Sequence, residues 1–369
     1  MKVLQIAPLW ETLPPPAYGG TEAVAHLLVE ELVRQGHDIT LWASGDSQTS
    51  ARLKSCYPVS LRTAEGIECK PVYSWQHAAL ALKNAGEYDL IHNHAGEEVM
   101  ALSHLVPSVP MLTTMHCLVT PDTKFIWDRY EGYFNTISWS QRKLMPPVTG
   151  GAFAGVAYNA VKVSSFPFQS EKADYLLFLS RISPEKGPEL AVEVAKRTGR
   201  RLIIAGKVDN VDREFFADIV EPLIDGDQII FKGEADGRMK RELYRSAACL
   251  LMPLTWDEPF GLVLTEAMAC GTPVIVFARG AAPEIVEHGE TGFIVTDVDE
   301  MIEAVGSIHT IDPAYCRARM KQRFDAPVMA ARYLDMYQSI LAERDARPLV
   351  PVPSGSKLEA VGLSPTHAA

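Results

Sequence analysis

The sequence lacks the features that mark membrane-spanning, disulfide-rich and nucleic-acid-binding proteins. No run approaches the roughly 18 apolar residues of a membrane-spanning helix, and the opening MKVLQIAPLW lacks the longer apolar core of a signal peptide. The six cysteines form no CxxC pair, which fits a reduced cytoplasmic protein better than a disulfide framework or a zinc site. A formal net charge of −11 argues against nucleic acid as a partner, because phosphate contacts need a basic face.

What the sequence does contain is an alternation of short apolar runs with amphipathic stretches, and it occurs twice. The first half holds VLQIAPL, DITLWA, YDLIHNH and PMLTTMH; after a break at residues 150–170 come DYLLFLS, RLIIAG, QIIFKG, CLLMPL and PVIVFA. Such alternation predicts parallel sheets with helices on both faces, and 369 residues suffice for two domains. We therefore predict an α/β protein with two facing, doubly wound Rossmann-like domains and a deep cleft between them.

The domain boundaries follow from these runs. Residues 1–162 form the predicted first domain and residues 170–325 the second, with a linker near residues 161–172. A helix over residues 326–345 is expected to return toward the first domain. The remaining residues, 346–369, are rich in Pro, Ser and Gly and are expected to form a disordered tail. Because open parallel sheets bind ligands beyond the carboxyl ends of their strands, the cleft is the expected site.

Two cations follow the first strand of the second domain, in the segment SRISPEKG. Arg181 and Lys186 precede a helix, where positive charge opposes the helix dipole. A bound anion would remove this conflict, since free N–H groups and both cations could converge on it. The alternative is a solvated loop in which Glu185 neutralises Lys186.

A pair of glycines occupies the corresponding loop of the first domain. Gly19 and Gly20 would let the backbone approach a ligand closely, and Thr21 could cap the helix that follows. A plain turn is the alternative interpretation.

Two glutamates frame the segment EPFGLVLTE. Glu258 belongs to the loop after CLLMPL, beside the unsatisfied N–H groups of a helix predicted from about residue 261 to 269. Glu266 lies in that helix, which is otherwise almost wholly apolar, so its carboxylate needs hydrogen-bond donors. Ribose hydroxyls would serve, because an ionised carboxylate only accepts; a structural arginine or a backbone amide is the alternative.

Histidines and aspartates supply further candidates. His116 follows PMLTTMH at a strand end and could be a base or a ligand of a sugar hydroxyl, although a structural role is the alternative; His92 and His94 end the neighbouring strand. The triplets Asp225-Gly-Asp227 and Asp297-Val-Asp299 are interpreted as a turn and a helix start. Neither lies at the carboxyl end of a strand, so no metal site is predicted.

With these residues placed, the chain resembles the family 4 retaining glycosyltransferases, which have the GT-B architecture, from Met1 to about Leu341. Four segments carry the resemblance: YGGTEAVAHLLVEELVRQGHDITL, RISPEKG, EPFGLVLTEAMACGTPVI and RGAAPEIVEHGETGFIV. The third contains the E-x7-E motif of the family. Two departures from the family pattern remove no charged group: Ser180 replaces a common glycine, and YNAV replaces Asn-Gly-Val before the linker.

The resemblance implies a role for each site residue. It assigns catalysis to Glu258, His116, Arg181 and Lys186, and binding of the donor diphosphate to Gly19, Gly20, Arg181, Lys186 and Leu262. It assigns contact with the donor sugar to Glu258, Phe260 and Gly261, and binding of the ribose to Glu266. It also implies that no cofactor and no divalent metal are needed.

The predicted function is therefore that of a metal-independent, retaining, hexosyltransferase-like enzyme in the cytoplasm. The predicted partners are a UDP-, GDP- or ADP-linked sugar donor and an acceptor that is a glycan, a lipid-linked molecule or a small molecule. Nucleic acid is excluded, while peripheral membrane contact and the oligomeric state are left open. A nucleotide-sugar epimerase of the same architecture and a non-catalytic sugar-nucleotide-binding subunit are the alternatives.

Overall fold

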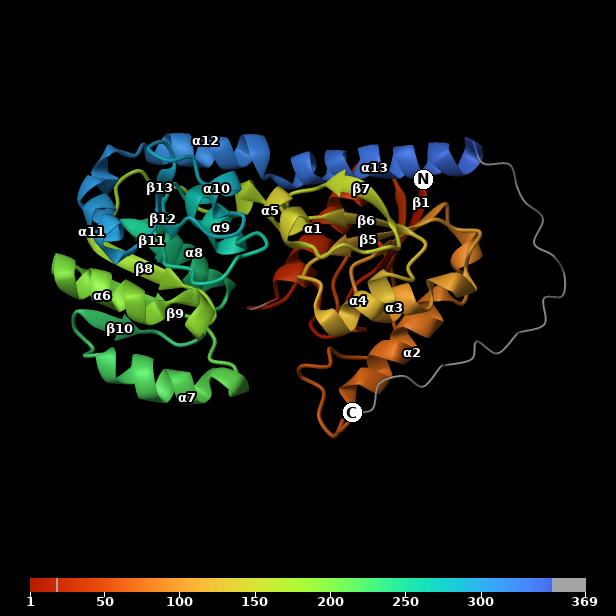
Figure 1. Ribbon diagram of the computed structural model, residues 1–369, viewed down its shortest axis with the longest axis horizontal. Helices are drawn as coiled ribbons and strands as arrows, with labels where there is room; N and C mark the ends of the chain where they lie inside the picture. The colour runs from red at the N-terminus through yellow and green to blue at the C-terminus, as the bar shows by residue number, and fades with distance from the viewer. Residues whose placement is uncertain (18, 347–369) are drawn as a thin grey trace, which may run out of the picture.

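The computed structural model describes residues 1–17 and 19–346, which form two parallel β-sheets side by side along the long axis of the molecule (Figure 1). The first sheet has the order β3-β2-β1-β4-β5-β6-β7, and the second has the order β10-β9-β8-β11-β12-β13. The pairs within both sheets are parallel, as in Lys2 opposite Asp38 and Tyr175 opposite Arg201. The predicted α/β architecture with two Rossmann-like domains is confirmed.

The strands are short and mostly buried. Those of the first sheet are β1 (Lys2–Ile6), β2 (Asp38–Trp42), β3 (Arg52–Lys54), β4 (Leu90–Asn93), β5 (Met111–Met115), β6 (Tyr133–Thr136) and β7 (Ala152–Val156). Those of the second are β8 (Tyr175–Leu179), β9 (Arg201–Ala205), β10 (Ile229–Phe231), β11 (Cys249–Met252), β12 (Val274–Phe277) and β13 (Gly292–Val295). Helices cover both faces, so central strands such as β11 are apolar at every position rather than at alternate ones.

The helices connect and cover the strands. In the first domain they are α1 (Gly20–Arg34), α2 (Lys70–Leu82), α3 (Glu97–Ala101), α4 (Pro121–Trp127) and α5 (Trp139–Leu144). In the second they are α6 (Pro188–Thr198), α7 (Arg213–Phe215), α8 (Gly237–Ser246), α9 (Leu262–Ala269), α10 (Ala282–Ile285), α11 (Val298–Ser307) and α12 (Pro313–Arg323). The last is α13 (Ala326–Ala346). None of the helices in residues 1–17 and 19–346 is both long and apolar enough to cross a membrane.

Each sheet reverses its strand order at one point. In the first sheet the chain moves from β1 outward to β2 and β3 and then back past β1 to β4; in the second it moves from β8 outward to β9 and β10 and then back past β8 to β11. Ligands of open α/β sheets bind beyond the carboxyl ends of the strands at such a reversal. The loops after β1 and β8 hold the glycine pair and the two cations, so both segments face the cleft.

Helix α13 packs on the first domain, although it follows the second in sequence (Figure 1). Met329, Ala330 and Tyr337 are buried in one apolar cluster with Val3 and Leu90. The residues expected to form a disordered tail, from 347 onward, lie outside the described residues.

The chain passes between the two domains twice, and the two passages are hydrogen bonded to each other. The amide of Val161 donates to the carbonyl oxygen of Phe324 at 2.9 Å, and the amide of Val163 donates to Asp325 Oδ1 at 3.0 Å. One detail of the sequence interpretation is wrong here. The break proposed at residues 150–170 contains β7, an edge strand whose first residues are exposed and therefore give no buried apolar run.

Candidate functional site

Two adjoining cavities occupy the cleft between the domains. The first, of about 340 Å³, contains Glu266 in its wall, and the second, of about 470 Å³, contains His116, Lys186 and Glu258. Both cavities are lined by Gly19, Gly20, Ser180, Arg181, Leu262 and Val263. The structure thus brings the predicted site residues of both domains to one continuous cleft.

The two predicted cations are each paired with a carboxylate. Lys186 Nζ contacts Glu258 Oε2, and the guanidinium of Arg181 contacts Glu185 Oε1. The proposed alternative pairing of Glu185 with Lys186 is therefore wrong, because Glu185 reaches Arg181 four residues earlier. Lys186 also lies 4.7 Å from the ring centre of Trp256, in cation–π geometry.

Glu258 is held by the backbone of the loop that follows β12. The amide of Ala281 donates to the carbonyl oxygen of Glu258 at 2.8 Å, and the indole Nε1 of Trp256 donates to Glu258 Oε2 at 3.2 Å. Gly280 has φ +55°, and a methyl group there would collide with the backbone of Glu258. The glycine of the RGAAPE segment is thus required for the position of the glutamate.

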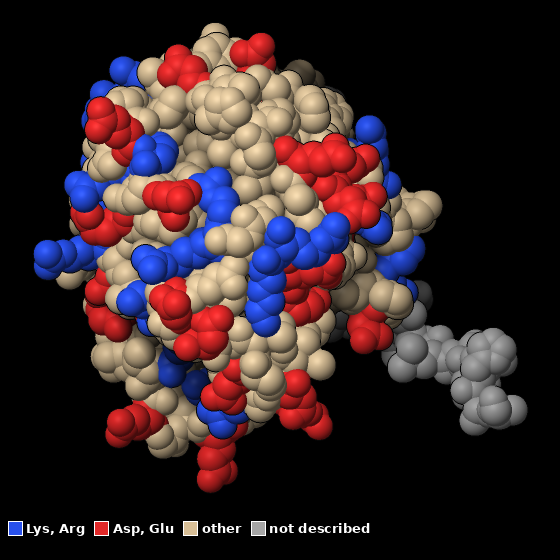
Figure 2. Space-filling view, turned by 90° about the vertical axis from the view of Figure 1, so that its left-hand side faces the viewer, with Lys and Arg blue, Asp and Glu red and all other residues tan. Residues whose placement is uncertain are grey.

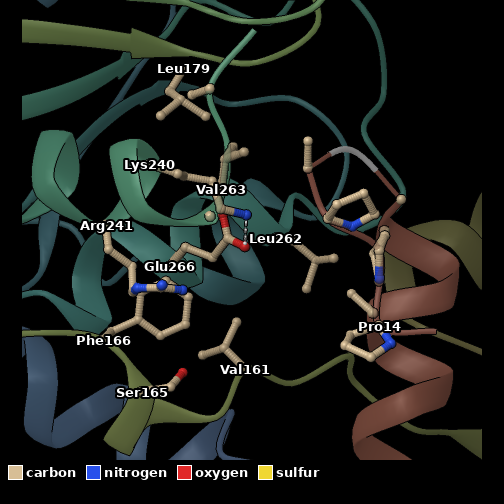
Figure 3. Close-up of a pocket in the computed structure, with 18 of the residues that line it drawn as sticks. Pro14, Val161, Ser165, Phe166, Leu179, Lys240, Arg241, Leu262, Val263 and Glu266 are labelled. Carbon is tan, nitrogen blue, oxygen red and sulfur yellow. Dashed lines mark hydrogen bonds and ion pairs between the residues drawn. The ribbon is translucent and has the colours of Figure 1, made fainter. Parts of the chain in front are cut away.

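Glu266 has two hydrogen-bond donors within the second domain. Lys240 Nζ lies 2.6 Å from Glu266 Oε1, and the hydroxyl of Tyr244 donates to Glu266 Oε2 at 3.0 Å. Figure 3 shows Lys240 and Glu266 side by side on the wall of the first cavity. The carboxylate is satisfied by a lysine and a tyrosine on α8, rather than by an arginine or backbone amide. It has about four lone-pair positions, so two contacts leave room for further donors.

Helix α9 begins between the two cavities. Its N-cap is Gly261, no side chain caps its first turn, and its second residue, Val263, lines both cavities together with Leu262. Uncapped N–H groups at a helix start attract anions. Phe260 is buried just before the cap and also lines the second cavity.

The glycine pair lies at the opposite wall. Gly20 is the first residue of α1 and Gly19 its N-cap, without any side-chain cap. The expected capping by Thr21 is therefore wrong, because Thr21 lies inside the first turn. A methyl group on Gly20 would touch Leu262 Cδ1 of the other domain at 3.4 Å, so the two walls meet here. Tyr18 lies outside the described residues.

His116 enters the second cavity from the end of β5. Its Nε2 lies 3.0 Å from Nδ1 of His94, which follows β4. Burial lowers the pKa of His116 to about 4, so the ring is neutral near pH 7. A neutral imidazole offers one donor and one acceptor nitrogen, and it suits contact with a hydroxyl group better than with an anion.

Three residues of the site were missed by the sequence interpretation. Lys240 and Trp256 pair with predicted residues, as described above. Glu22, in the first turn of α1, lines the second cavity and is almost fully buried. Burial raises the pKa of Glu22 to about 7. An acidic residue directly after Gly-Gly-Thr is ordinary in a first helical turn, so no local pattern distinguishes Glu22 as a site residue.

The Asp-x-Asp triplets form structural hydrogen bonds with backbone amides. Asp225 Oδ1 accepts from the amides of Asp227 and Ile229, both at 2.9 Å, and Asp297 caps α11 through the amide of Glu300. Among the residues that the structure describes, no group of three or more His, Cys, Asp or Glu is arranged to hold a metal ion.

On the outer end of the second domain, positive and negative side chains are interspersed (Figure 2).

Sequence comparison finds two family models that match the chain, one in each domain. "Glycosyltransferase Family 4" matches residues 18–148, and "Glycosyl transferases group 1" matches residues 163–322. An uncharacterized glycosyltransferase of Methanocaldococcus jannaschii is 26% identical over 339 residues, which covers 80% of this chain and 85% of the relative.

Solved structures share the fold. A glycosyltransferase involved in avilamycin A biosynthesis superposes with a TM-score of 0.72 at 23% identity, covering 93% of this chain and 98% of the other. The Anabaena protein HepE, solved in complex with UDP and glucose, superposes with a TM-score of 0.71 at 18% identity, covering 92% of this chain and all of HepE. At these identities the likeness establishes the two-domain architecture.

Proposed function

We propose, because this chain belongs to the family 4 glycosyltransferases with the GT-B fold, that it moves a sugar from a nucleoside-diphosphate donor to an acceptor with retention of configuration and without a metal ion. The family models identify it as a glycosyltransferase, so the epimerase and the non-catalytic subunit weighed above become outcomes of the test below.

One observation supports the proposal most directly: the two cavities meet at four of the five residues assigned to the diphosphate. Arg181, Gly19, Gly20 and Leu262 line both cavities, while Glu266 lines only the first and His116 only the second. A nucleoside-diphosphate sugar has the same order of parts, with the diphosphate between ribose and sugar. We therefore assign the first cavity to the nucleoside and the second to the sugar. The UDP and glucose bound by HepE support a donor of this class.

Charge stabilisation on the leaving diphosphate is the proposed source of catalysis. As the glycosidic bond breaks, negative charge develops on the phosphate oxygens, where Arg181, Lys186 and the amides at the start of α9 would lie. Such preorganised groups perform what a metal ion performs in other enzymes. Both Asp-x-Asp triplets are engaged in structural hydrogen bonds, which agrees with a reaction that needs no metal.

The carboxylates that pair with the cations also have a role in the proposed reaction. Glu185 and Glu258 neutralise Arg181 and Lys186 in the cleft. The donor diphosphate would take over the cations, and Glu258 would then be released to contact the sugar ring. Retention would follow from attack on the face that the diphosphate leaves, with the leaving phosphate accepting the proton of the acceptor hydroxyl.

The experiment is nucleotide release measured with UDP-, GDP- and ADP-sugars, each with and without a panel of glycan, lipid-linked and small-molecule acceptors. A transferase releases nucleoside diphosphate only when an acceptor is present. Isomerised donor without nucleotide release would instead indicate an epimerase, and binding without turnover a non-catalytic subunit. The donor base is chosen beforehand by thermal shift, since a ligand at about 100 times its Kd stabilises by about 2.7 kcal/mol.

A further inference from the structure

A continuous chain of buried hydrogen bonds connects His116 in the cleft with helix α13, which packs on one face of the first sheet. It includes residues from β1, β4, β5, β6 and α13, nearly all of them fully buried. In order from the cleft, its members are His116, His94, Gln5, Tyr337, His92, Thr114 and Asn135. Buried polar groups are costly unless every donor meets an acceptor, so each proton in this hydrogen-bond chain has a definite position.

The donor-to-acceptor direction of this hydrogen-bond chain is set at its far end by a backbone carbonyl. The side-chain amide nitrogen of Asn135 lies 3.3 Å from the carbonyl oxygen of Thr136, which can only accept. Asn135 Oδ1 must therefore face Thr114, whose hydroxyl donates to it at 2.8 Å. A hydroxyl has one proton, so Thr114 can only accept from His92 Nε2 at 2.7 Å. His92 consequently carries its proton on Nε2.

The protons in the middle of the hydrogen-bond chain are fixed in the same way. Nδ1 of neutral His92 has no proton, so the hydroxyl of Tyr337 donates to it at 2.6 Å. Tyr337 has then used its proton, and it accepts from the side-chain amide nitrogen of Gln5 at 3.0 Å. The oxygen of Gln5 therefore faces Nε2 of His94, also at 3.0 Å, and His94 must carry its proton there.

The last link reaches the cleft. Nδ1 of His94 has no proton, so His116 must donate to it from Nε2 at 3.0 Å. Nδ1 of His116 is then a bare acceptor, and it has no hydrogen-bond partner within residues 1–17 and 19–346. Burial lowers the pKa of His92 and His94 well below the usual range and that of His116 to about 4, so all three rings are neutral, as the reasoning requires.

We propose that this hydrogen-bond chain fixes His116 as the tautomer with its proton on Nε2, so that Nδ1 accepts a hydrogen bond from a hydroxyl of the bound sugar. Tyr337, Gln5 and His94 are thereby positioning residues for the transfer reaction. The role toward the sugar rests on the proposed function, whereas the tautomer itself is a property of the free protein. This tautomer favours a donor sugar with a hydroxyl group next to His116. It disfavours a group that can only accept a hydrogen bond, because the unprotonated Nδ1 is itself an acceptor.

Two tyrosines of α13 provide a matched pair of variants. Tyr337→Phe removes the hydroxyl that connects Gln5 with His92, which frees the Gln5 amide to rotate and His116 to adopt either tautomer. Tyr333→Phe makes the same change one turn away, at an equally buried position. Within residues 1–17 and 19–346, the hydroxyl of Tyr333 forms hydrogen bonds only with Thr114 and Asn135, beside the links to His116, so its loss leaves every one of those links intact.

The test is a two-dimensional ¹H–¹⁵N spectrum of the histidine rings of the full chain without ligand, with His116 assigned by its absence in His116→Gln. We expect the wild type and Tyr333→Phe to hold the proton on Nε2 of His116 with a preference of about ten to one or more, the scale of one hydrogen bond. Tyr337→Phe should show a mixture. A wild-type ring protonated on Nδ1 would overturn the proposal even if neither tyrosine variant folds.

A second measurement tests the consequence for transfer, in the nucleotide-release assay described above. Tyr337→Phe should lower turnover about threefold to tenfold relative to Tyr333→Phe, because one hydrogen bond to the sugar becomes unreliable. Equal turnover in the two variants, with a changed tautomer in Tyr337→Phe, would show that the tautomer has no role in the reaction. Because the spectra need neither donor nor acceptor, failure of this proposal is distinguishable from failure of the transferase assignment.

Discussion

The ion pair between Lys186 and Glu258 lets stability and catalysis be separated in one set of variants. Only 12% of the Lys186 side chain and 16% of the Glu258 side chain are exposed. Removing one member of a fully buried ion pair lowers the free energy of unfolding by about 3–5 kcal/mol. Because this pair is slightly exposed, we expect Lys186→Met to lower it by about 2 kcal/mol. The same variant should lower turnover by about 100-fold or more, the loss expected for one group that stabilises the transition state.

The double variant Lys186→Met/Glu258→Gln gives the decisive comparison. With both charges of this pair removed, neither Lys186 nor Glu258 is left as an unpaired ion, so stability should return to within about 1 kcal/mol of the wild type. Turnover should stay at least about 100-fold reduced, because the charge opposite the leaving phosphate is still missing.

Urea unfolding and initial rates of nucleotide release measure the two quantities on the same protein. Lys124→Met is the control, since Lys124 pairs with Asp128 at 2.6 Å on α4, outside both cavities of the cleft. It should change turnover less than about twofold, because this partly exposed pair contributes little to stability and lies away from the cleft. Recovery of turnover together with stability in the double variant would refute the catalytic role of Lys186 and make the pair structural.

Three further predictions follow from the geometry of the cleft. Glu266→Ala should weaken nucleoside-diphosphate binding by about tenfold or more, because hydrogen bonds to a charged group are lost; an unchanged affinity in titration calorimetry would exclude its ribose role. Glu22, with its pKa raised to about 7, binds its proton more tightly folded than unfolded, so its contribution to stability is full below about pH 4.5 and is lost as the pH rises toward 7. Glu22→Gln should therefore stabilise the protein relative to wild type by on the order of 3 kcal/mol at pH 8 and leave its stability nearly unchanged at pH 4. The same difference in unfolding free energy between variant and wild type at both pH values would contradict the burial argument. Gly280→Ala should displace Glu258 and abolish most turnover, whereas the exposed substitution Gly289→Ala, also at positive φ but with open space around it, should cost stability only.

The parts of the fold that could be predicted are those with a local sequence signal. Buried strands such as β8 and β11 are unbroken apolar runs, and α9 follows a proline-glycine segment, so their ends fix where Arg181 and Glu258 lie. The short edge strands β3 and β7 are partly exposed and lack such runs, which is why they could not be recognised.

The parts of the site that could not be predicted depend on contacts between distant segments. Glu266 was recognised as a carboxylate that needs donors, but its partner Lys240 lies on another helix, and only the packing of α8 against α9 brings the two together. The pairing of Lys186 with Glu258 spans 72 residues, so charge spacing along the chain pointed to the nearer Glu185 instead. His116 and His94 were expected on neighbouring strands, yet nothing local could indicate their connection to Tyr337.

Helix α13 gives this protein an unusual order of assembly. A ribosome delivers residues 1–160 long before residues 326–346, so the first sheet emerges while the apolar surface around Val3 and Leu90 still lacks its cover. The second domain has its own core and can fold during that interval. The half of the enzyme that is synthesised first is therefore completed last, and a chain cut short before residue 326 would carry all the assigned site residues without Tyr337, the hydroxyl that connects Gln5 with His92.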